Sequence, residues 1–342
     1  MKKLLFMLGI ANTFWAFAGY TEEDILAHLK ERSGFEPSVF NSLEASAEGL
    51  ITFGLTDPDA IKTFLKMVKD GEYGIPRDRV VFDFERKEID DDQLEGIVDA
   101  LMDDPGVPTI NLSRNRLTSK SFLLLKQLFA NEKLVLENLD LSYNKIDFQK
   151  QLQYPLFADE FAGSLEGNQT LKTLNLSGNK VTLASMSAFM AKIKDSTALE
   201  SLVLNDCVLA SFNENVEFDG PRKDQLQLFA IWAGKAPNLS KINLTGNMFN
   251  SEEMMLFFQH FKTDTKKALV DLDFSILGGV KEVEEWIKGH KKTKVCMHVI
   301  SSDKGILEEA GCVSFQPHSE TTFEKRTALY GSRKIETLDY DK

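Results

Sequence analysis

A short pattern recurs along the middle of this chain, and it constrains the fold more than any other feature. Six segments read apolar, any, apolar, any, any, then usually asparagine, any, apolar. They are FDFERKEI from Phe82, INLSRNRL from Ile110, LDLSYNKI from Leu139, LNLSGNKV from Leu174, LVLNDCVL from Leu202 and INLTGNMF from Ile242. A seventh, weaker copy, LDFSILGG, begins at Leu272. Such a repeat requires a fold in which one structural unit is stacked many times.

Each copy predicts a short strand followed by a turn. Apolar residues at alternate positions point to one side of a strand and the intervening polar residues to the other, so stacked copies form a parallel sheet with one buried face. The asparagine falls where the chain turns away, and its buried amide can satisfy backbone groups that the turn leaves unpaired. We therefore expect a structural ladder of buried side chains at this position, formed by Asn115, Asn144, Asn179, Cys207 and Asn247. Lys87 and Leu277 fit the position poorly and indicate where the ladder ends.

Helical patterns lie between the predicted strands, several with clear start signals. Thr56 or Asp57 precedes Pro58 as a helix cap, and Asn250 with Glu253 three residues later reads as a variant of the capping box. Further helices are expected over 119–129, 183–193 and 280–287. Strand and helix alternate, so the fold class is α/β.

The full pattern L-x-x-L-x-L-x-x-N-x-L resembles that of the leucine-rich repeat proteins, with the first leucine present at Leu136, Leu171, Leu199 and Leu239. The copies that start at 82, 110, 139, 174, 202, 242 and 272 are separated by 28, 29, 35, 28, 40 and 30 residues. Repeats of 28 to 29 residues are most similar to the ribonuclease-inhibitor-like subtype. The resemblance implies a right-handed solenoid, or horseshoe, with a parallel sheet on the concave face and helices on the convex face. It assigns 46–300 to the solenoid, 19–45 to an N-terminal helical cap and 301–342 to a C-terminal cap and polar tail.

Two of the repeats are too long, which places insertions at 147–163 and 211–224. Insertions in a repeat array fall in loops beside the regular surface, where function tends to lie. The alternative is that each insertion is tolerated length variation that packs on its own helix.

The polar side of the predicted strands is the surface most suited to binding. Its polar residues suit a protein or peptide partner held by hydrogen bonds and a few charge contacts, rather than an apolar small-molecule pocket. The alternative is that they are only solvated strand residues of a chain that binds elsewhere. The candidate partner-binding residues are Asp83, Glu85, Asn111, Asn138, Asp140, Asn175, Asn205, Asn243, Asp271 and Asp273.

Charge and motif content narrow the function classes. Lys and Arg number 40 against 52 Asp and Glu, and a net charge of −12 argues against a nucleic-acid binder and favours a basic or neutral partner surface. Neither a phosphate-binding loop nor a hydrolase or metalloprotease motif occurs in the sequence. Cys296-x-His298 is the nearest approach to a metal pair, and a core role explains it better. We expect no enzyme activity, no metal and no cofactor.

The resemblance leaves several functions open. Proteins of this subtype act as inhibitors and scaffolds, which favours protein recognition, and some activate small GTPases. A regulator of a small GTPase, or a secreted effector acting in a host cell, is therefore the alternative, although no residue here aligns with a functional residue of that activity. A structural surface protein without a tight partner is a further class. Repeats joined to a ubiquitin-ligase domain are disfavoured, because the segment after the last repeat is too short.

The amino terminus reads as a signal peptide over residues 1–18. Lys2 and Lys3 precede an apolar run from Leu4 to Phe17, and Ala16-Phe17-Ala18 is a small-x-small cleavage site. An uncleaved membrane anchor is the alternative, but the run is shorter than a spanning helix requires. We therefore expect a secreted or periplasmic protein without a membrane span after cleavage. Export makes a disulfide between Cys296 and Cys312 possible.

Export can be tested directly. Expression of the full chain with its own leader should give a secreted form whose amino-terminal sequence begins at Gly19, because cleavage follows Ala18. Replacing Leu5 and Leu8 by Arg should abolish secretion, since the apolar run is what the export machinery recognises. Secreted protein that still begins at Met1 contradicts the cleavage site.

Overall fold

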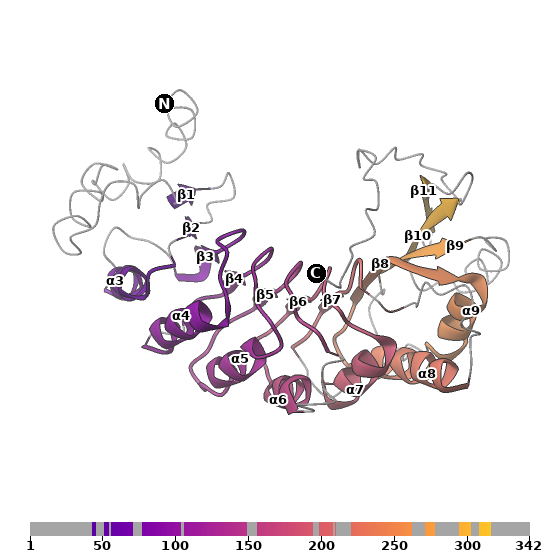
Figure 1. Ribbon diagram of the computed structural model, residues 1–342, viewed down its shortest axis with the longest axis horizontal. Coiled ribbons are helices and arrows are strands. Elements are labelled where there is room, and N and C mark those ends of the chain that lie inside the picture. Colours follow the sequence, from indigo (N-terminus) through magenta and orange to yellow (C-terminus); the bar gives the residue numbers. More distant parts are fainter. Residues whose placement is uncertain are drawn as a thin grey trace, which may run out of the picture. The chain divides into compact units, whose positions relative to one another are not determined.

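The protein is an α/β fold of parallel strands and helices. The computed structural model describes residues 43–45, 51–54, 56–70, 77–103, 106–148, 156–193, 198–207, 209, 220–261, 271–277, 294–301 and 308–315 of the 342-residue chain. The chain forms two compact units, one comprising 1–179 with 196–199 and the other 180–195 with 200–342. Figure 1 shows the order of the elements along the chain.

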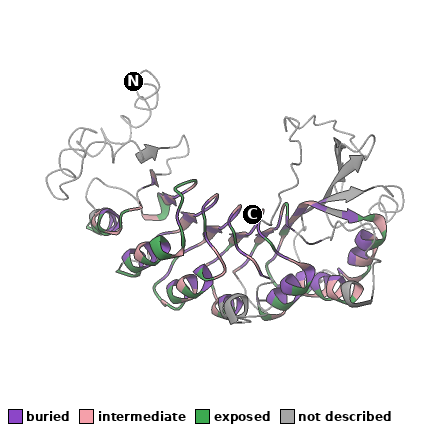
Figure 2. Ribbon diagram, viewed as in Figure 1, coloured by how far each residue is buried: buried purple, intermediate pink, exposed green. Residues whose placement is uncertain are grey.

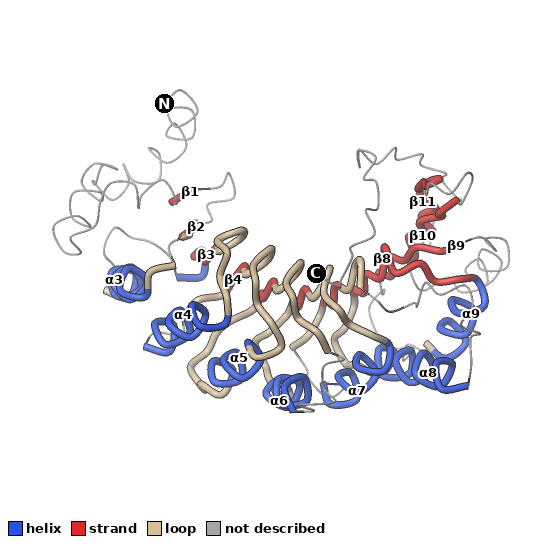
Figure 3. The backbone as a smooth tube through the Cα atoms, in the orientation of Figure 1, coloured by secondary structure: helices blue, strands red, loops and turns tan. Residues whose placement is uncertain are grey.

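The first unit alternates strands with helices. Its elements are β1 (Leu43–Ala45), β2 (Ile51–Phe53), α3 (Pro58–Lys69), the 3₁₀ helix η3 (Arg77–Arg79), β3 (Val80–Asp83), α4 (Asp91–Asp103), β4 (Thr109–Asn111), α5 (Ser121–Phe129), β5 (Asn138–Asp140), α6 (Leu156–Leu165) and β6 (Thr173–Asn175). Strands β2 to β6 are parallel neighbours, and β1 pairs with β2 in the antiparallel sense. Within this unit the helices lie on one side of the strands (Figure 3).

The repeat register predicted from the sequence is the register of the sheet. Ile110 lies beside Phe82 on one side and Leu139 on the other, and Leu139 lies beside Leu174. In β4, β5 and β6 the middle residue is buried and the two flanking residues are half-buried (Figure 2). One residue of each strand therefore faces the core, and two contribute to the opposite face.

The second unit continues the alternation with longer strands. Its elements are α7 (Leu183–Ile193), β7 (Ser201–Val203), α8 (Gly220–Lys235), β8 (Lys241–Asn250), α9 (Ser251–His260), β9 (Asp271–Leu277), β10 (Lys294–Ser301) and β11 (Glu308–Phe315). Strands β7 to β10 are parallel, and β11 is antiparallel to β10. The pairing of β8 with β9 shifts register between Leu244 and Phe249.

Several helix boundaries follow from the start signals in the sequence. Asp57, rather than Thr56, caps α3: its carboxylate accepts a hydrogen bond from Ala60 N at 2.9 Å. Asn250 and Glu253 form the full reciprocal capping box at the start of α9. Helix α7 covers the same residues as its prediction, and α5 begins two residues later than predicted. The predicted helix over 280–287 lies outside the described residues.

The first insertion contributes aromatic side chains to the core. Phe148 and Phe161 are both buried, and both contact Phe122 of α5, with ring centroids 5.1 and 4.7 Å apart. Helix α6 begins at Leu156, so 149–155, which lie outside the described residues, precede it. These two phenylalanines therefore pack on the neighbouring helix and are not exposed in a loop.

Other sequence predictions fall on the carboxyl-terminal strands or beyond the described residues. The antiparallel register places Cys312 opposite His298 and Cys296 opposite Ser314. Diagonal neighbours of this kind typically have Cα atoms about 7–8 Å apart, farther than most disulfides span, so this register does not favour the Cys296–Cys312 bridge. Most of the insertion at 211–224, all of 1–18 and 316–342 lie outside the described residues. Among the helices that the structure describes, none is both long and apolar enough to cross a membrane.

The aromatic contact between α5 and α6 predicts a large loss of stability when it is removed. Phe161→Ala should lower the free energy of unfolding by about 3–5 kcal/mol, because it leaves a cavity beside Phe122 and Phe129. Leu123→Ala on the exposed side of α5 is the control and should cost less than about 1 kcal/mol. Urea titration followed by circular dichroism measures both; equal losses contradict a core position for Phe161.

Candidate binding surface

Buried asparagine amides tie successive turns together. Asn144 Nδ2 donates to Leu112 O of the preceding turn and to Leu141 O of its own turn, both at 2.9 Å, and its Oδ1 accepts from Leu117 N. Asn115 makes the equivalent bonds one turn earlier and Asn179 one turn later. These are the backbone groups that each turn leaves unpaired within its own copy.

The second unit contains the same feature once more. Asn247 Nδ2 donates to Leu204 O at 2.7 Å and to Leu244 O at 2.9 Å. Cys207, at the equivalent position one copy earlier, is buried. The ladder residues are thus all buried, whereas the candidate residues in β3 to β6 lie on the half-exposed side of their strands.

In five strands, the residue after the first apolar residue of the repeat has a structural task that the sequence pattern does not reveal. Its side-chain oxygen accepts a hydrogen bond from the backbone N–H two residues later, as in an Asx turn. Asp83, Asn111, Asp140, Asn175 and Asn243 all do this, at 2.8 to 3.1 Å. Five of the candidate partner-binding residues therefore also bond to their own backbone.

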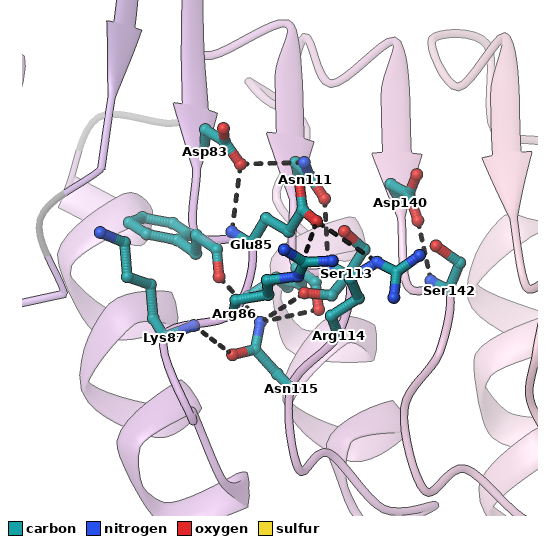
Figure 4. Close-up of polar contacts among 12 residues, drawn as sticks. Asp83, Glu85, Arg86, Lys87, Asn111, Ser113, Arg114, Asn115, Asp140 and Ser142 are labelled. Carbon is teal, nitrogen blue, oxygen red and sulfur yellow. Dashed lines mark hydrogen bonds and ion pairs between the residues drawn. The ribbon is translucent and has the colours of Figure 1, made fainter. Parts of the chain in front are cut away.

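The same side chains also bond to one another across the sheet. In the first unit Asn111 Nδ2 donates to Asp83 Oδ1 at 2.9 Å, and Asn175 Nδ2 donates to Asp140 Oδ2 at 2.8 Å. Asn138 Nδ2 donates to Thr109 Oγ1 at 3.1 Å. The polar face of β3 to β6 is a set of mutually oriented side chains that remain half-exposed. Figure 4 shows three of them, Asp83, Asn111 and Asp140.

The remaining candidates in the second unit are Asn205, Asp271 and Asp273. Asn205 is half-buried and precedes Asp206 in the turn after β7. Asp271 and Asp273 lie in β9, in register with Lys241 and Asn243 of β8. Their backbone positions put them at equivalent places of neighbouring strands.

A column of residues in the left-handed backbone conformation follows the strands. Arg86, Arg114 and Tyr143 have φ of 57°, 57° and 54°, and Gly178 occupies the same position with φ of 64°. Their backbones are joined turn to turn, since Arg86 N donates to Ser113 O, Arg114 N to Ser142 O and Tyr143 N to Ser177 O. Side chains at this position consequently lie next to one another.

Charged and aromatic groups interact along this column, as Figure 4 shows for the two arginines. The Glu85 carboxylate lies 3.4 Å from Arg86 Nε and 3.3 Å from Arg114 Nε. The Arg114 guanidinium lies 4.6 Å from the centroid of the Tyr143 ring. A Cβ atom at Gly178 would come within 2.3 Å of that ring, so glycine is required where the ring lies.

Sequence reasoning identified Glu85 but missed Arg86, Arg114 and Tyr143. One signal was available: glycine occupies the position before asparagine in two copies, at Gly178 and Gly246, and both have positive φ. A repeat position that is occupied by glycine in several copies indicates a left-handed backbone conformation. The non-glycine residues at that position in the other copies are then expected to have the same conformation.

The ladder predicts that two asparagines of the same repeat, the buried Asn144 and the half-exposed Asn138, contribute very differently to stability. Asn144→Ala should destabilise the protein by about 3 kcal/mol, because it leaves the buried carbonyls of Leu112 and Leu141 without this donor. Asn138→Ala removes only a half-exposed bond to Thr109 and should cost about 1 kcal/mol or less. Chemical denaturation of both variants checks this, and similar costs contradict the ladder's role.

The described residues contain no group of three or more His, Cys, Asp and Glu side chains that could hold a metal ion. No protein-family model matches the chain, and a search of curated proteins finds no match. The function is therefore argued from the geometry of this surface.

Proposed function

We propose that the repeats stack as a leucine-rich-repeat solenoid and that the protein is a binding module for a protein or peptide. The surface proposed to bind is the polar face of β3 to β6, which we call the strand face; its residues are Asp83, Thr109, Asn111, Asn138, Asp140, Thr173 and Asn175. Export through the amino-terminal segment belongs to the same proposal, and its support is the sequence of residues 1–18.

One observation carries the proposal: the side chains of the strand face are half-exposed, and six of the seven are already held in place by hydrogen bonds. Asn175 orients Asp140, and Asn111 orients Asp83, across neighbouring strands. A partner that bonds to pre-oriented groups loses less side-chain entropy on association. The small, polar character of the face favours hydrogen-bonded recognition of a polypeptide over a small apolar ligand.

Asp140 offers the sharpest test of the strand face. Saturable capture of one protein from a host or envelope extract by the mature chain, weakened about tenfold by Asp140→Arg, is the expected result, because the substitution reverses charge at the centre of the face. Quantitative pull-down over a range of bait concentrations measures it. Capture that Asp140→Arg leaves unchanged contradicts recognition through this face.

Two control variants show whether a loss of capture comes from the charge at position 140. One tests for an effect on folding, and the other tests for an effect of the changed net charge. Asp140→Asn keeps the side-chain oxygen that accepts from Ser142 N, as Asn111 and Asn175 do at their own strand ends. It replaces Oδ2, which accepts from Asn175 Nδ2, by an amide nitrogen, and this should cost about 1 kcal/mol of stability. The variant should therefore retain the fold while losing the carboxylate. Glu132→Arg makes the same charge change on an exposed turn after α5 and should leave capture within about twofold.

A further inference from the structure

The turns that follow β3, β4 and β5 carry positive charge in a chain that is strongly negative. Residues 85–88, 113–116 and 142–145 contain five cations and two anions, whereas the chain as a whole has a net charge of −12. The equivalent turns of the second unit, 205–208 and 245–248, contain no cation in their sequence. We call the charged residues of the first three turns the turn edge: Glu85, Arg86, Lys87, Glu88, Arg114, Arg116 and Lys145.

We propose that the turn edge is a second binding surface, which receives a carboxylate-bearing, acidic peptide segment. It adjoins the strand face, since Glu85 N donates to Asp83 Oδ1, but its support does not depend on that face. The cations come from adjacent turns whose backbones are hydrogen-bonded to one another, so their spacing is fixed by the fold. Fixed spacing distinguishes a built surface from scattered surface lysines and arginines.

The arginines of the turn edge are held in position but remain accessible. Glu85 contacts Arg86 and Arg114 through Nε, the inner nitrogen of each guanidinium, and the Arg114 guanidinium lies over the Tyr143 ring. The side chains of Arg86 and Arg114 are 68% and 33% exposed. A guanidinium held in this way can present its outer nitrogens to a carboxylate as a planar, two-pronged donor.

The turn edge already binds two carboxylates of its own chain. Glu85 lies between two arginines, and Glu88 pairs with Arg116 at 2.8 Å, while the Arg116 side chain remains 55% exposed. Local pairing limits repulsion among the cations and leaves a modest positive excess. Such a surface fits a few discrete carboxylates better than nucleic acid, which requires an extended basic face to displace counterions.

Binding of a defined acidic probe tests the proposal. A fluorescein-labelled hexaglutamate peptide should bind the mature chain saturably by fluorescence anisotropy, and more weakly at about 300 mM than at about 50 mM salt, because screening shortens the range of the charges. Arg86→Glu and Arg116→Glu, both at exposed positions, should each weaken binding about tenfold. Absence of saturable binding overturns the proposal.

Three comparisons make the result specific. Lys133→Glu changes net charge by the same amount on an exposed turn and should leave affinity within about twofold, so an equal loss overturns the proposal. Arg114→Lys keeps the charge but not the planar fork and should weaken binding severalfold. Tighter binding of an oligothymidylate or of phosphatidylserine vesicles than of hexaglutamate overturns the assignment to an acidic peptide.

The same assay distinguishes this surface from the strand face. Asp140→Asn should not weaken hexaglutamate binding, because the carboxylate it removes repels the probe. A loss with this variant contradicts the turn edge as the site of the peptide. Failure of the peptide to bind, with capture of a protein partner still sensitive to Asp140→Arg, overturns only the present inference.

Discussion

The buried asparagine amide is the interaction on which the rest of the structure depends. Each turn leaves strand carbonyls unpaired, and one amide supplies two donors and an acceptor at a point where two successive copies meet. Asn144 bonds to Leu112 O in one copy and to Leu141 O in the next, so it fixes the distance between them. Once that distance is fixed, the strands pair in register and every equivalent residue stands one strand spacing from its neighbour.

This spacing imposes a size rule on the residues in the left-handed column. Neighbouring strands are about 4.8 Å apart, so two bulky side chains at equivalent positions must either stack on each other or turn away from each other. The Tyr143 ring occupies the space next to Gly178, and the Asp206 carboxylate occupies the space next to Gly246, where a Cβ would approach within 2.0 Å. The glycine at position 178 leaves room for the Tyr143 ring, over which the Arg114 guanidinium lies.

The sequence predicts the interior better than the surface, for a physical reason. Burial enforces a pattern, so the strand register and the asparagine ladder could be read in advance. The cap at Asn250 follows from the spacing of its capping box, whereas the sequence leaves Thr56 and Asp57 as alternatives for the cap of α3. Surface contacts between residues 28 or more positions apart leave no such pattern. The bond from Asn111 to Asp83, and the placement of Arg86 beside Arg114, follow only from the register of the assembled turns.

Net charge is a poor guide to the partner of a protein built from repeats. The repeat distance that stacks the strands also gathers residues of one sequence column into one strip of surface, so the composition of the column sets the local field. A chain with a charge of −12 can therefore carry a positive strip, as it does after β3 to β5. Because Glu85 occupies the gap between two arginines, the strip is a short series of paired charges. A ligand that matches it must place its carboxylates at the repeat spacing, which makes the geometry of the fold, more than the amount of charge, the source of selectivity.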